Sequence, residues 1–299
     1  MRKIRTYRDV DPDAGRELLD QVVEQRRRLA ERLAPVRALV AVVSGKGGVG
    51  KSAVTANLAA ALALEGLRVG ALDADLNGPS LGRMLGAAGA RLGDDAGGVL
   101  PPRGIEGIKV VSMEHLQEEG APLRWKGADG HASLWRGAAE TAALRELLAD
   151  VAWGELDCLL IDVPPGVDKI ARLLELVSLR GALLVTTPSE ISCRVVARSA
   201  GLLREAGLER VALVANMTHR LCDACGHPTP LFEADATGAL AADTGLETWA
   251  RIPFDGRLAV ATDEGRSLAA EAPHSTVAAI FRALARRVVE RWLPEEAEA

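Results

Sequence analysis

The chain has 299 residues, which is enough for one large α/β domain or two small ones. Its net charge of −5 gives no general reason to expect a nucleic acid or an anionic membrane surface as a partner. No apolar run approaches the ~18 residues of a membrane span, and no apolar signal segment follows the polar N-terminus. We therefore expect a cytoplasmic protein, in which four cysteines are too few for a disulfide scaffold.

The first 36 residues differ from the rest, and we expect a helical extension (residues 1–36) ahead of a domain spanning 37–299. Apolar residues recur at helical spacing over residues 13–34, which predicts a helix that Pro35 ends. The polar run at 25–28, with three arginines, is typical of a solvated helix face. Contact with nucleic acid is the alternative for this run.

From residue 38 onward, apolar strands alternate with helices. The predicted strands are 38–43, 68–72, 109–112, 158–162, 182–186, 211–215 and 248–252. The predicted helices are 53–64, 80–85, 138–150, 170–179, 191–206, 236–244 and 275–293, and surface excursions are expected at 91–107 and 120–131. This order predicts an α/β fold with a mostly parallel, doubly wound sheet and helices on both faces.

An octapeptide between the first of these strands and its helix fits the phosphate-binding pattern G-x-x-x-x-G-K-[ST]. It consists of Gly45, Lys46, Gly47, Gly48, Val49, Gly50, Lys51 and Ser52, all of which we expect to bind ATP. The glycines let the backbone aim its N–H groups inward at a helix N-terminus. Lys51 is spaced to reach the β- and γ-phosphates, and the Ser52 hydroxyl to bind Mg²⁺. The pattern predicts a site for a nucleoside triphosphate.

Two acids, Asp73 and Asp75, follow the second predicted strand. At the carboxyl end of a strand beside the phosphate loop, they are well placed for Mg²⁺ and the attacking water. We expect Asp75 to orient or deprotonate that water as a catalytic residue, and Asp73 to support it and bind Mg²⁺. The alternative is a capped turn into the short helix at 80–85.

A third acid, Asp162, ends the apolar strand predicted over 158–162, in the form of a Walker B element. We expect it to hold Mg²⁺ together with Ser52, directly or through a water molecule. The Pro164-Pro165-Gly166 turn that follows is stiff, and the N–H group of its glycine is expected to sense the γ-phosphate. A strand that ends in one acid is a weak signal by itself, but it indicates a Walker B element when a phosphate loop lies upstream.

A second motif, Cys222-Asp223-Ala224-Cys225, provides two thiols that can bind one metal or cluster. A mononuclear or cubane site needs about four ligands. Cys158 and Cys193 fall in a predicted strand and a predicted helix, where small buried side chains are expected. One chain therefore supplies half a site, which a symmetric dimer would complete.

Other interpretations of the cysteine pair are open from the residues alone. A redox dithiol and a zinc site shared between two chains both fit the spacing. His219 and His227 flank the pair and are possible ligands, although solvated loop histidines are more typical.

Together these motifs resemble the Mrp/ApbC-type P-loop ATPases, iron–sulfur cluster carriers related to MinD/ParA proteins and to the nitrogenase iron protein. The resemblance covers nearly all of residues 36–293. It is carried by residues 44–52, 72–75, 78–80, 135–137, 153–157, 161–166, 216–217, 222–226 and 252–255. The phosphate loop identifies only the wider superfamily. The Pro-Pro-Gly turn and the CxxC after Asn216 and Met217 point to the cluster carriers.

The resemblance implies a SIMIBI/MinD-like fold, slow ATP hydrolysis and a homodimer. Lys46 would act as a catalytic residue beside Lys51 by reaching the phosphates of the partner, where a second cation stabilises transition-state charge. Asn216 would contact the adenine. Cys222 and Cys225 would hold a [4Fe-4S] cluster shared between two subunits, for transfer to apo iron–sulfur proteins.

The segment after the Walker B strand is one of the places where the chain departs from the resemblance. Many relatives read Pro-Pro-Gly-Thr-Gly-Asp, whereas residues 164–169 read Pro-Pro-Gly-Val-Asp-Lys, which affects the expected hydrolysis rate rather than binding. Two other functions compete with the carrier: a partitioning or positioning ATPase of the ParA/MinD type, and an ATP-gated electron donor like the nitrogenase iron protein.

Overall fold

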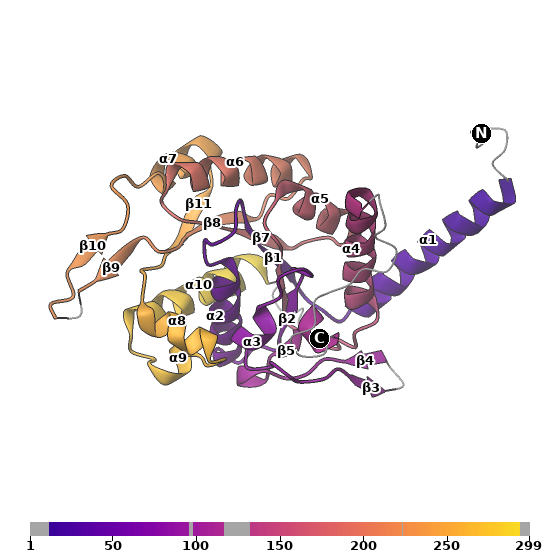
Figure 1. Ribbon diagram of the computed structural model, residues 1–299, viewed down its shortest axis with the longest axis horizontal. Coiled ribbons are helices and arrows are strands. Elements are labelled where there is room, and N and C mark those ends of the chain that lie inside the picture. Colours follow the sequence, from indigo (N-terminus) through magenta and orange to yellow (C-terminus); the bar gives the residue numbers. More distant parts are fainter. Residues whose placement is uncertain (1–11, 96–97, 117–131, 223, 294–299) are drawn as a thin grey trace.

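A seven-stranded sheet forms the centre of the computed structural model, which describes residues 12–95, 98–116, 132–222 and 224–293 (Figure 1). Its strands are β1 (Leu39–Ser44), β2 (Val69–Asp73), β5 (Lys109–Val111), β6 (Cys158–Asp162), β7 (Gly181–Thr186), β8 (Val211–Ala215) and β11 (Glu247–Arg251). The strand order is β11-β8-β7-β1-β6-β2-β5, and every neighbouring pair is parallel. β1 therefore lies in the middle, and the loop after it opens at the same edge as those after β2 and β6.

Helices cover both faces of the sheet (Figure 1). One core receives side chains from α2 (Lys51–Leu64), α3 (Leu81–Met84), α8 (Gly256–Asp263), α9 (Leu268–Glu271) and α10 (Thr276–Trp292). The other receives side chains from α1 (Pro12–Leu33), α4 (Ala132–Ala149), α5 (Val167–Leu176), α6 (Glu190–Glu205) and α7 (Thr237–Thr244). The predicted α/β fold with a parallel, doubly wound sheet is confirmed.

The two cores explain why the strands are unbroken apolar runs in the sequence. In β1, Val40 and Val42 point into one core, and Ala41 and Val43 point into the other. All four are fully buried. Successive side chains of a strand alternate between the faces, so a sheet covered on both sides needs apolar residues at every position.

Short elements depart from the predictions. Strands β9 (His219–Leu221) and β10 (Pro228–Pro230) form an antiparallel hairpin that sequence patterns did not indicate. A second hairpin, β3 (Gly93–Asp95) with β4 (Gly98–Leu100), and the 3₁₀ turn η2 (Ile105–Gly107) lie in the excursion expected at 91–107. Strands of three residues show no measurable period, and the four-residue helix α9 was missed for the same reason of length. The eight-residue helix α8 was also not predicted. The other expected excursion, 120–131, lies outside the described residues.

Two predicted helix boundaries need correction. The helix expected over 170–179 begins at Val167 and ends at Leu176. Gly166 directly before it adopts φ 123°, which is not a helical conformation, and Val177 directly after it is extended. The helix expected over 138–150 begins earlier, at Ala132.

The end of α1 packs against the domain. Leu29 and Leu33 are buried in the same core as residues of α4, and Arg28 forms an ion pair with Asp150 at 2.9 Å. Residues 25–28 are all exposed, as a solvated helix face requires. Within the described residues, no helix is both long enough and apolar enough to cross a membrane.

Candidate functional site

The phosphate loop follows the central strand β1 and ends where α2 begins at Lys51. Gly48 and Gly50 both adopt φ 79°, a left-handed conformation that L side chains rarely take. A Cβ atom on Gly50 would lie 2.3 Å from Nδ2 of Asn216, so a side chain has no space there. The first N–H groups of α2 open onto this loop, which gives a concave site for anionic oxygens.

Asp162 gathers the polar side chains at the start of α2. Its Oδ2 atom lies 2.5 Å from Nζ of Lys51 and accepts a hydrogen bond from Oγ of Ser52 at 2.6 Å. Its Oδ1 atom accepts a hydrogen bond from Oγ1 of Thr55 at 2.6 Å. Asp162 is fully buried and Lys51 nearly so, and this cluster brings the Walker B acid to the phosphate loop.

Thr55 is the member of this cluster that sequence reasoning missed. It lies four residues after Lys51 on the same face of α2, and its hydroxyl is also within hydrogen-bond distance of the Lys51 carbonyl, at 3.0 Å. The i, i+4 spacing of a hydroxyl residue behind the P-loop lysine was the available signal.

The acid expected to support catalysis, Asp73, is buried at the end of β2. Its carboxylate accepts backbone hydrogen bonds from Asp75 at 3.0 Å, from Ser80 at 2.8 Å and from Leu81 at 2.9 Å. Burial, and then the nearby charge of Asp162, raise the pKa of Asp73 above its ordinary value, although the backbone donors oppose this. Asp73 thus organises the loop that carries Asp75.

Asp75 is half-buried in that loop, and its Oδ1 accepts the backbone N–H of Gly78 at 3.1 Å. Lys46 is also half-buried, and its carbonyl accepts a hydrogen bond from the Ser44 hydroxyl at 3.1 Å. The roles predicted for these two side chains toward water and toward a partner's phosphates stay predictions.

Asn216 directly follows strand β8, and its side chain lies against the phosphate loop. It donates from Nδ2 to the carbonyl of Val49 at 2.9 Å. The structure therefore gives Asn216 a contact with the loop backbone, while its expected contact with adenine stays a prediction.

The oxygen atoms around Asp162 suit a magnesium ion by their chemistry. Ser52 and Asp162 present a hydroxyl and a carboxylate that already lie within hydrogen-bond distance of each other. Asp73 is the register partner of Asp162 across β2 and β6, which brings a second carboxylate to the same edge. Mg²⁺ prefers one or two carboxylates together with phosphate oxygens, and these residues fit that set.

Cys222 and Cys225 lie between the strands of the β9–β10 hairpin. Leu221 pairs with Pro228, and the connecting residues turn through a bond from the Gly226 N–H to the Cys222 carbonyl at 2.8 Å. Gly226 adopts φ 71°, which suits glycine in this turn. Both Cys222 and Cys225 are exposed. The hairpin extends away from the sheet at the left of Figure 1.

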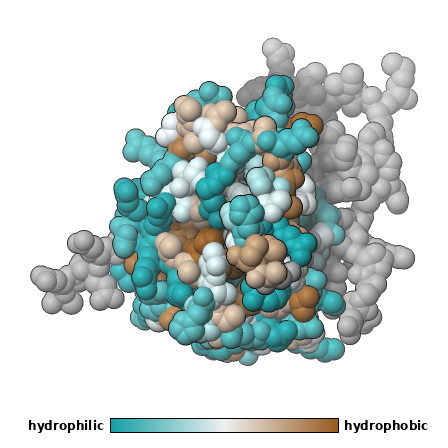
Figure 2. Space-filling model, turned by 90° about the vertical axis from the view of Figure 1, so that its left-hand side faces the viewer, coloured by the Kyte–Doolittle hydropathy of each residue, from teal (hydrophilic) through white to brown (hydrophobic). Residues whose placement is uncertain are grey.

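The surface beside the hairpin is shown in Figure 2, which views the molecule from that side. Hydrophilic residues dominate this face, with apolar residues in small patches between them. The backbone N–H of Phe254 donates a hydrogen bond to the His219 carbonyl in β9 at 2.8 Å. The side chain of Phe254 is 46% exposed.

The hairpin alone does not complete a metal site. Within the part of the chain that the structure describes, no group of three or more His, Cys, Asp and Glu side chains is arranged to hold a metal ion. The two remaining cysteines cannot contribute, because Cys158 and Cys193 are buried in the two separate cores, as predicted. Burial raises the pKa of the Cys158 thiol to about 12.

With this geometry in place, comparison with known proteins identifies the family. A model of the ParA family described as "NUBPL iron-transfer P-loop NTPase" matches residues 35–289. The chain belongs to this family. An iron–sulfur cluster carrier protein of Saccharolobus solfataricus is 35% identical over 92% of this chain and 90% of its own length. The mouse cytosolic Fe-S cluster assembly factor NUBP2 is 36% identical over 87% of this chain and 93% of its own.

Solved structures of P-loop proteins share the fold of this family member. A nucleotide-binding protein from Archaeoglobus fulgidus, in complex with ADP, superposes with a TM-score of 0.69. It is 34% identical, covering 81% of this chain and 91% of that chain. The cell division ATPase MinD of Pyrococcus furiosus superposes with a TM-score of 0.59 at 23% identity, covering 85% of this chain and 99% of its own. At that identity, the likeness to MinD concerns the fold alone.

Proposed function

We propose that this chain is an ATP-hydrolysing carrier that holds a [4Fe-4S] cluster between two copies of itself and passes it to apo iron–sulfur proteins. The observation that carries the proposal is the exposed Cys222–Cys225 pair on a hairpin of the same chain that forms the P-loop site. The relatives named as cluster carriers and assembly factors, which match over most of this chain, support the cargo. The mouse relative is named cytosolic, and we propose a cytoplasmic location here too.

The incomplete ligand set is the reason to propose a dimer. A cubane cluster needs about four protein ligands, and one hairpin offers two thiols. A two-fold axis through the cluster would bring Cys222 and Cys225 from each chain to it. The exposed Phe254 beside β9 supplies apolar surface for such a contact.

ATP is proposed to bind at the phosphate loop. Gly45 to Gly50 would contribute backbone N–H groups, Lys51 a positive charge toward the β- and γ-phosphates, and Asn216 a contact with the adenine. When bound, Mg²⁺ neutralises charge on the phosphates, and Ser52, Asp162 and Asp73 are the residues to hold it. Asp75 would orient the attacking water.

Lys46 is proposed to act on the other subunit. It lies at the start of the loop, five residues before Lys51. A dimer would bring it to the partner's phosphates, where it stabilises the charge of the transition state. Dimerisation would thus link ATP turnover to the cluster site.

Anaerobic reconstitution with iron and sulfide tests this function. The wild-type chain should gain about four irons per dimer and a broad absorption band near ~400 nm, and should activate an apo-protein that needs a [4Fe-4S] cluster. The Cys222→Ala/Cys225→Ala variant should gain neither iron nor the band. Cys193→Ala, which removes a buried thiol, is the matched control and should behave as wild type. Cluster binding that survives in the double variant would refute the proposal.

A further inference from the structure

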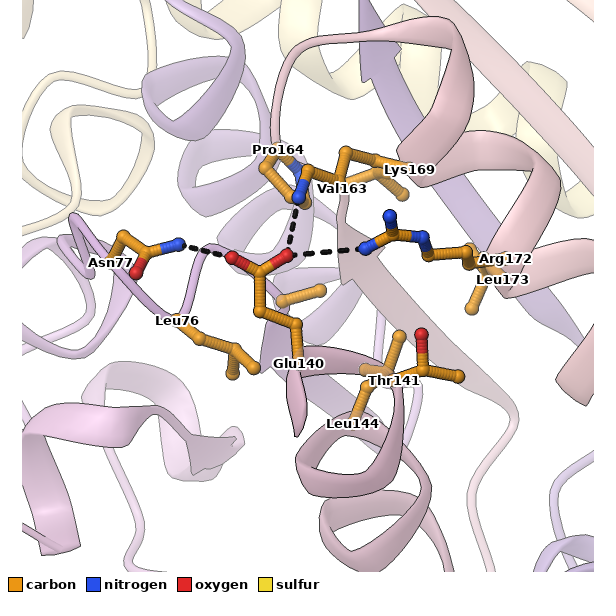
Figure 3. Close-up of a pocket in the computed structure, with 11 residues that line it drawn as sticks. Leu76, Asn77, Glu140, Thr141, Leu144, Val163, Pro164, Lys169, Arg172 and Leu173 are labelled. Carbon is orange, nitrogen blue, oxygen red and sulfur yellow. Dashed lines mark hydrogen bonds and ion pairs between the residues drawn. The ribbon is translucent and has the colours of Figure 1, made fainter. Parts of the chain in front are cut away.

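Glu140 joins the loop that follows β2 to helix α5, which begins directly after the Pro-Pro-Gly turn that follows β6 (Figure 3). It projects from α4 between them, and its Oε1 atom accepts a hydrogen bond from Nδ2 of Asn77 at 2.9 Å. Its Oε2 atom forms ion pairs with Lys169 and, at 3.3 Å, with Arg172. One carboxylate thus holds three side chains, of which one comes from the first loop and two from α5.

Both loops belong to the proposed ATP site. Asn77 lies two residues after Asp75, in the loop that Asp73 organises through its backbone bonds. Lys169 lies in the first turn of α5, which begins directly after Gly166 and so follows the turn after Asp162. Since Asp73 and Asp162 are register partners, the two loops leave adjacent strands at the same edge. A link between them therefore connects two segments at the edge of the sheet where the ATP site is proposed.

The linked side chains line a small pocket together with apolar residues, and they are partly shielded from water. The cavity has a volume of about 30 Å³ and is lined in part by Leu76, Leu144, Val163 and Leu173. The side chain of Glu140 is only 11% exposed, and those of Lys169 and Arg172 are 26% and 31% exposed. Charge-assisted bonds in such surroundings are stronger than those on an open surface.

The charges favour an ionised Glu140. Burial alone would raise its pKa, but hydrogen bonds from Lys169 and Asn77, with the charges of Lys169 and Arg172, leave the pKa below its ordinary value. Asp168 lies 3.9 Å from Lys169 and 3.8 Å from Arg172 at the solvent side and adds a second negative charge. Among the side chains that the structure describes, this network contains two cations and two anions.

We propose that Glu140 is a positioning residue that locks the loop of Asp75 to the Pro-Pro-Gly turn, so that the two move as one unit during ATP turnover. The inference rests on the proposed ATP hydrolysis and adds a residue to it. It also gives a role to the segment 164–169, where this chain departs from many relatives, because Lys169 lies in that segment.

The test compares Glu140→Gln with Glu146→Gln, an exposed glutamate six residues further along α4. Glutamine keeps the size and the bond from Asn77 but loses the negative charge that holds Lys169 and Arg172. We expect kcat for ATP hydrolysis to fall about tenfold, with KM changed less than about threefold, because misplaced catalytic groups lower turnover more than binding. Glu146→Gln should leave both constants unchanged. Equal kcat in Glu140→Gln and wild type would overturn the proposal.

A second measurement does not depend on activity. Hydrogen exchange of the nucleotide-free full chain should become faster over both 74–79 and 164–169 in Glu140→Gln. Lys169→Gln, which alters only the first turn of α5, should also speed exchange over 74–79, across the pocket. Exchange confined to 164–169 in Lys169→Gln would refute the coupling. A wild-type chain that hydrolyses no ATP would refute the proposed ATPase instead, while the exchange result would still decide the coupling.

Discussion

Asp73 and Asp162 are register partners at the ends of adjacent parallel strands, yet their carboxylates accept hydrogen bonds from different segments of the chain. Asp162 accepts side-chain bonds from the phosphate-loop end of α2, including that of Lys51. Asp73 accepts backbone bonds from the loop after β2, including that of Asp75. The two acids therefore form the junction between the groups expected to bind phosphate and those expected to act on water.

The two lysines of the phosphate loop should separate binding from turnover. Lys51→Ala removes the buried cation that lies 2.5 Å from Asp162, and we expect it to abolish ATP binding. Lys46→Ala removes a half-buried side chain at the start of the loop, and we expect slower turnover with binding retained. Titration with a fluorescent ATP analogue measures ATP affinity, and a phosphate-release assay measures turnover. Turnover equal to wild type in both variants would refute these roles.

The hydroxyl of Thr55 should contribute to stability through Asp162. Thr55→Val keeps the shape of the side chain but leaves the buried carboxylate without a donor that lies 2.6 Å from it. Because hydrogen bonds to charged groups contribute about 1.5–3 kcal/mol, we expect the free energy of unfolding in urea to fall by about 2 kcal/mol.

The control for this variant is Thr244→Val in α7. The hydroxyl of Thr244 donates to the Leu240 carbonyl at 2.6 Å, the helical i−4 contact that Thr55 also makes. Removal of the Thr244 hydroxyl should lower the free energy of unfolding clearly less than removal of the Thr55 hydroxyl. Equal losses in the two variants would mean that the bond to Asp162 is unimportant.

The backbone of the phosphate loop should reject a side chain at Gly50. Gly50→Ala places a Cβ at φ 79° and against Asn216, so we expect loss of ATP affinity and a destabilisation of at least about 1 kcal/mol. Gly201→Ala is the matched control, because that glycine lies inside α6 with open space around it. It should be stabilised by up to about 1 kcal/mol. Unchanged binding and thermal unfolding in Gly50→Ala would contradict the loop geometry.

Asp157 should make stability depend on pH in the acid range. Burial raises its pKa, but bonds from the Arg68 side chain and backbone and from Arg37 outweigh this and lower the pKa to about 2. A carboxyl group whose pKa is lowered by folding stabilises the folded state at pH values above the pKa of the unfolded chain, which is about 4. This contribution disappears as the pH falls through the pKa of the folded state. The difference corresponds to about 2 kcal/mol at neutral pH.

Urea unfolding of Asp157→Asn at several pH values checks this. The variant should be less stable than wild type at pH 7, and the difference should shrink steadily as pH falls below about 4. Glu155→Gln removes an exposed partner of Arg68 and should show no comparable pH dependence. A difference between Asp157→Asn and wild type that is constant with pH would contradict the assigned cause.

The main framework of this fold is predictable from sequence because its signals are local. An unbroken apolar run such as β1 indicates a strand covered on both faces, and the glycine pattern after it indicates a phosphate loop. The structure then brings Ser52 and Asp162 together, as the expected magnesium set requires. Each of these features depends on residues close together in the chain or on the order of strands.

The features that were missed depend on contacts between distant residues. Asn77 and Lys169 lie 63 and 29 residues from Glu140, and no spacing rule connects them. The β9–β10 hairpin has three-residue strands, whose pairing depends on the turn at Gly226 rather than on periodicity. The resemblance implied that Asn216 belongs to the ATP site, but its hydrogen bond to the Val49 carbonyl depends on the placement of β8 two strands away from β1.

Native mass spectrometry of the anaerobically reconstituted protein tests the central claim most directly, because it weighs the cluster and counts the chains that hold it. Two chains with one cluster of about four irons and four sulfides are expected for wild type. In a mixture of wild type with Cys222→Ala/Cys225→Ala, hybrid dimers should carry no cluster. A cluster on a single chain, or on a hybrid dimer, would contradict a site built from two half-sites.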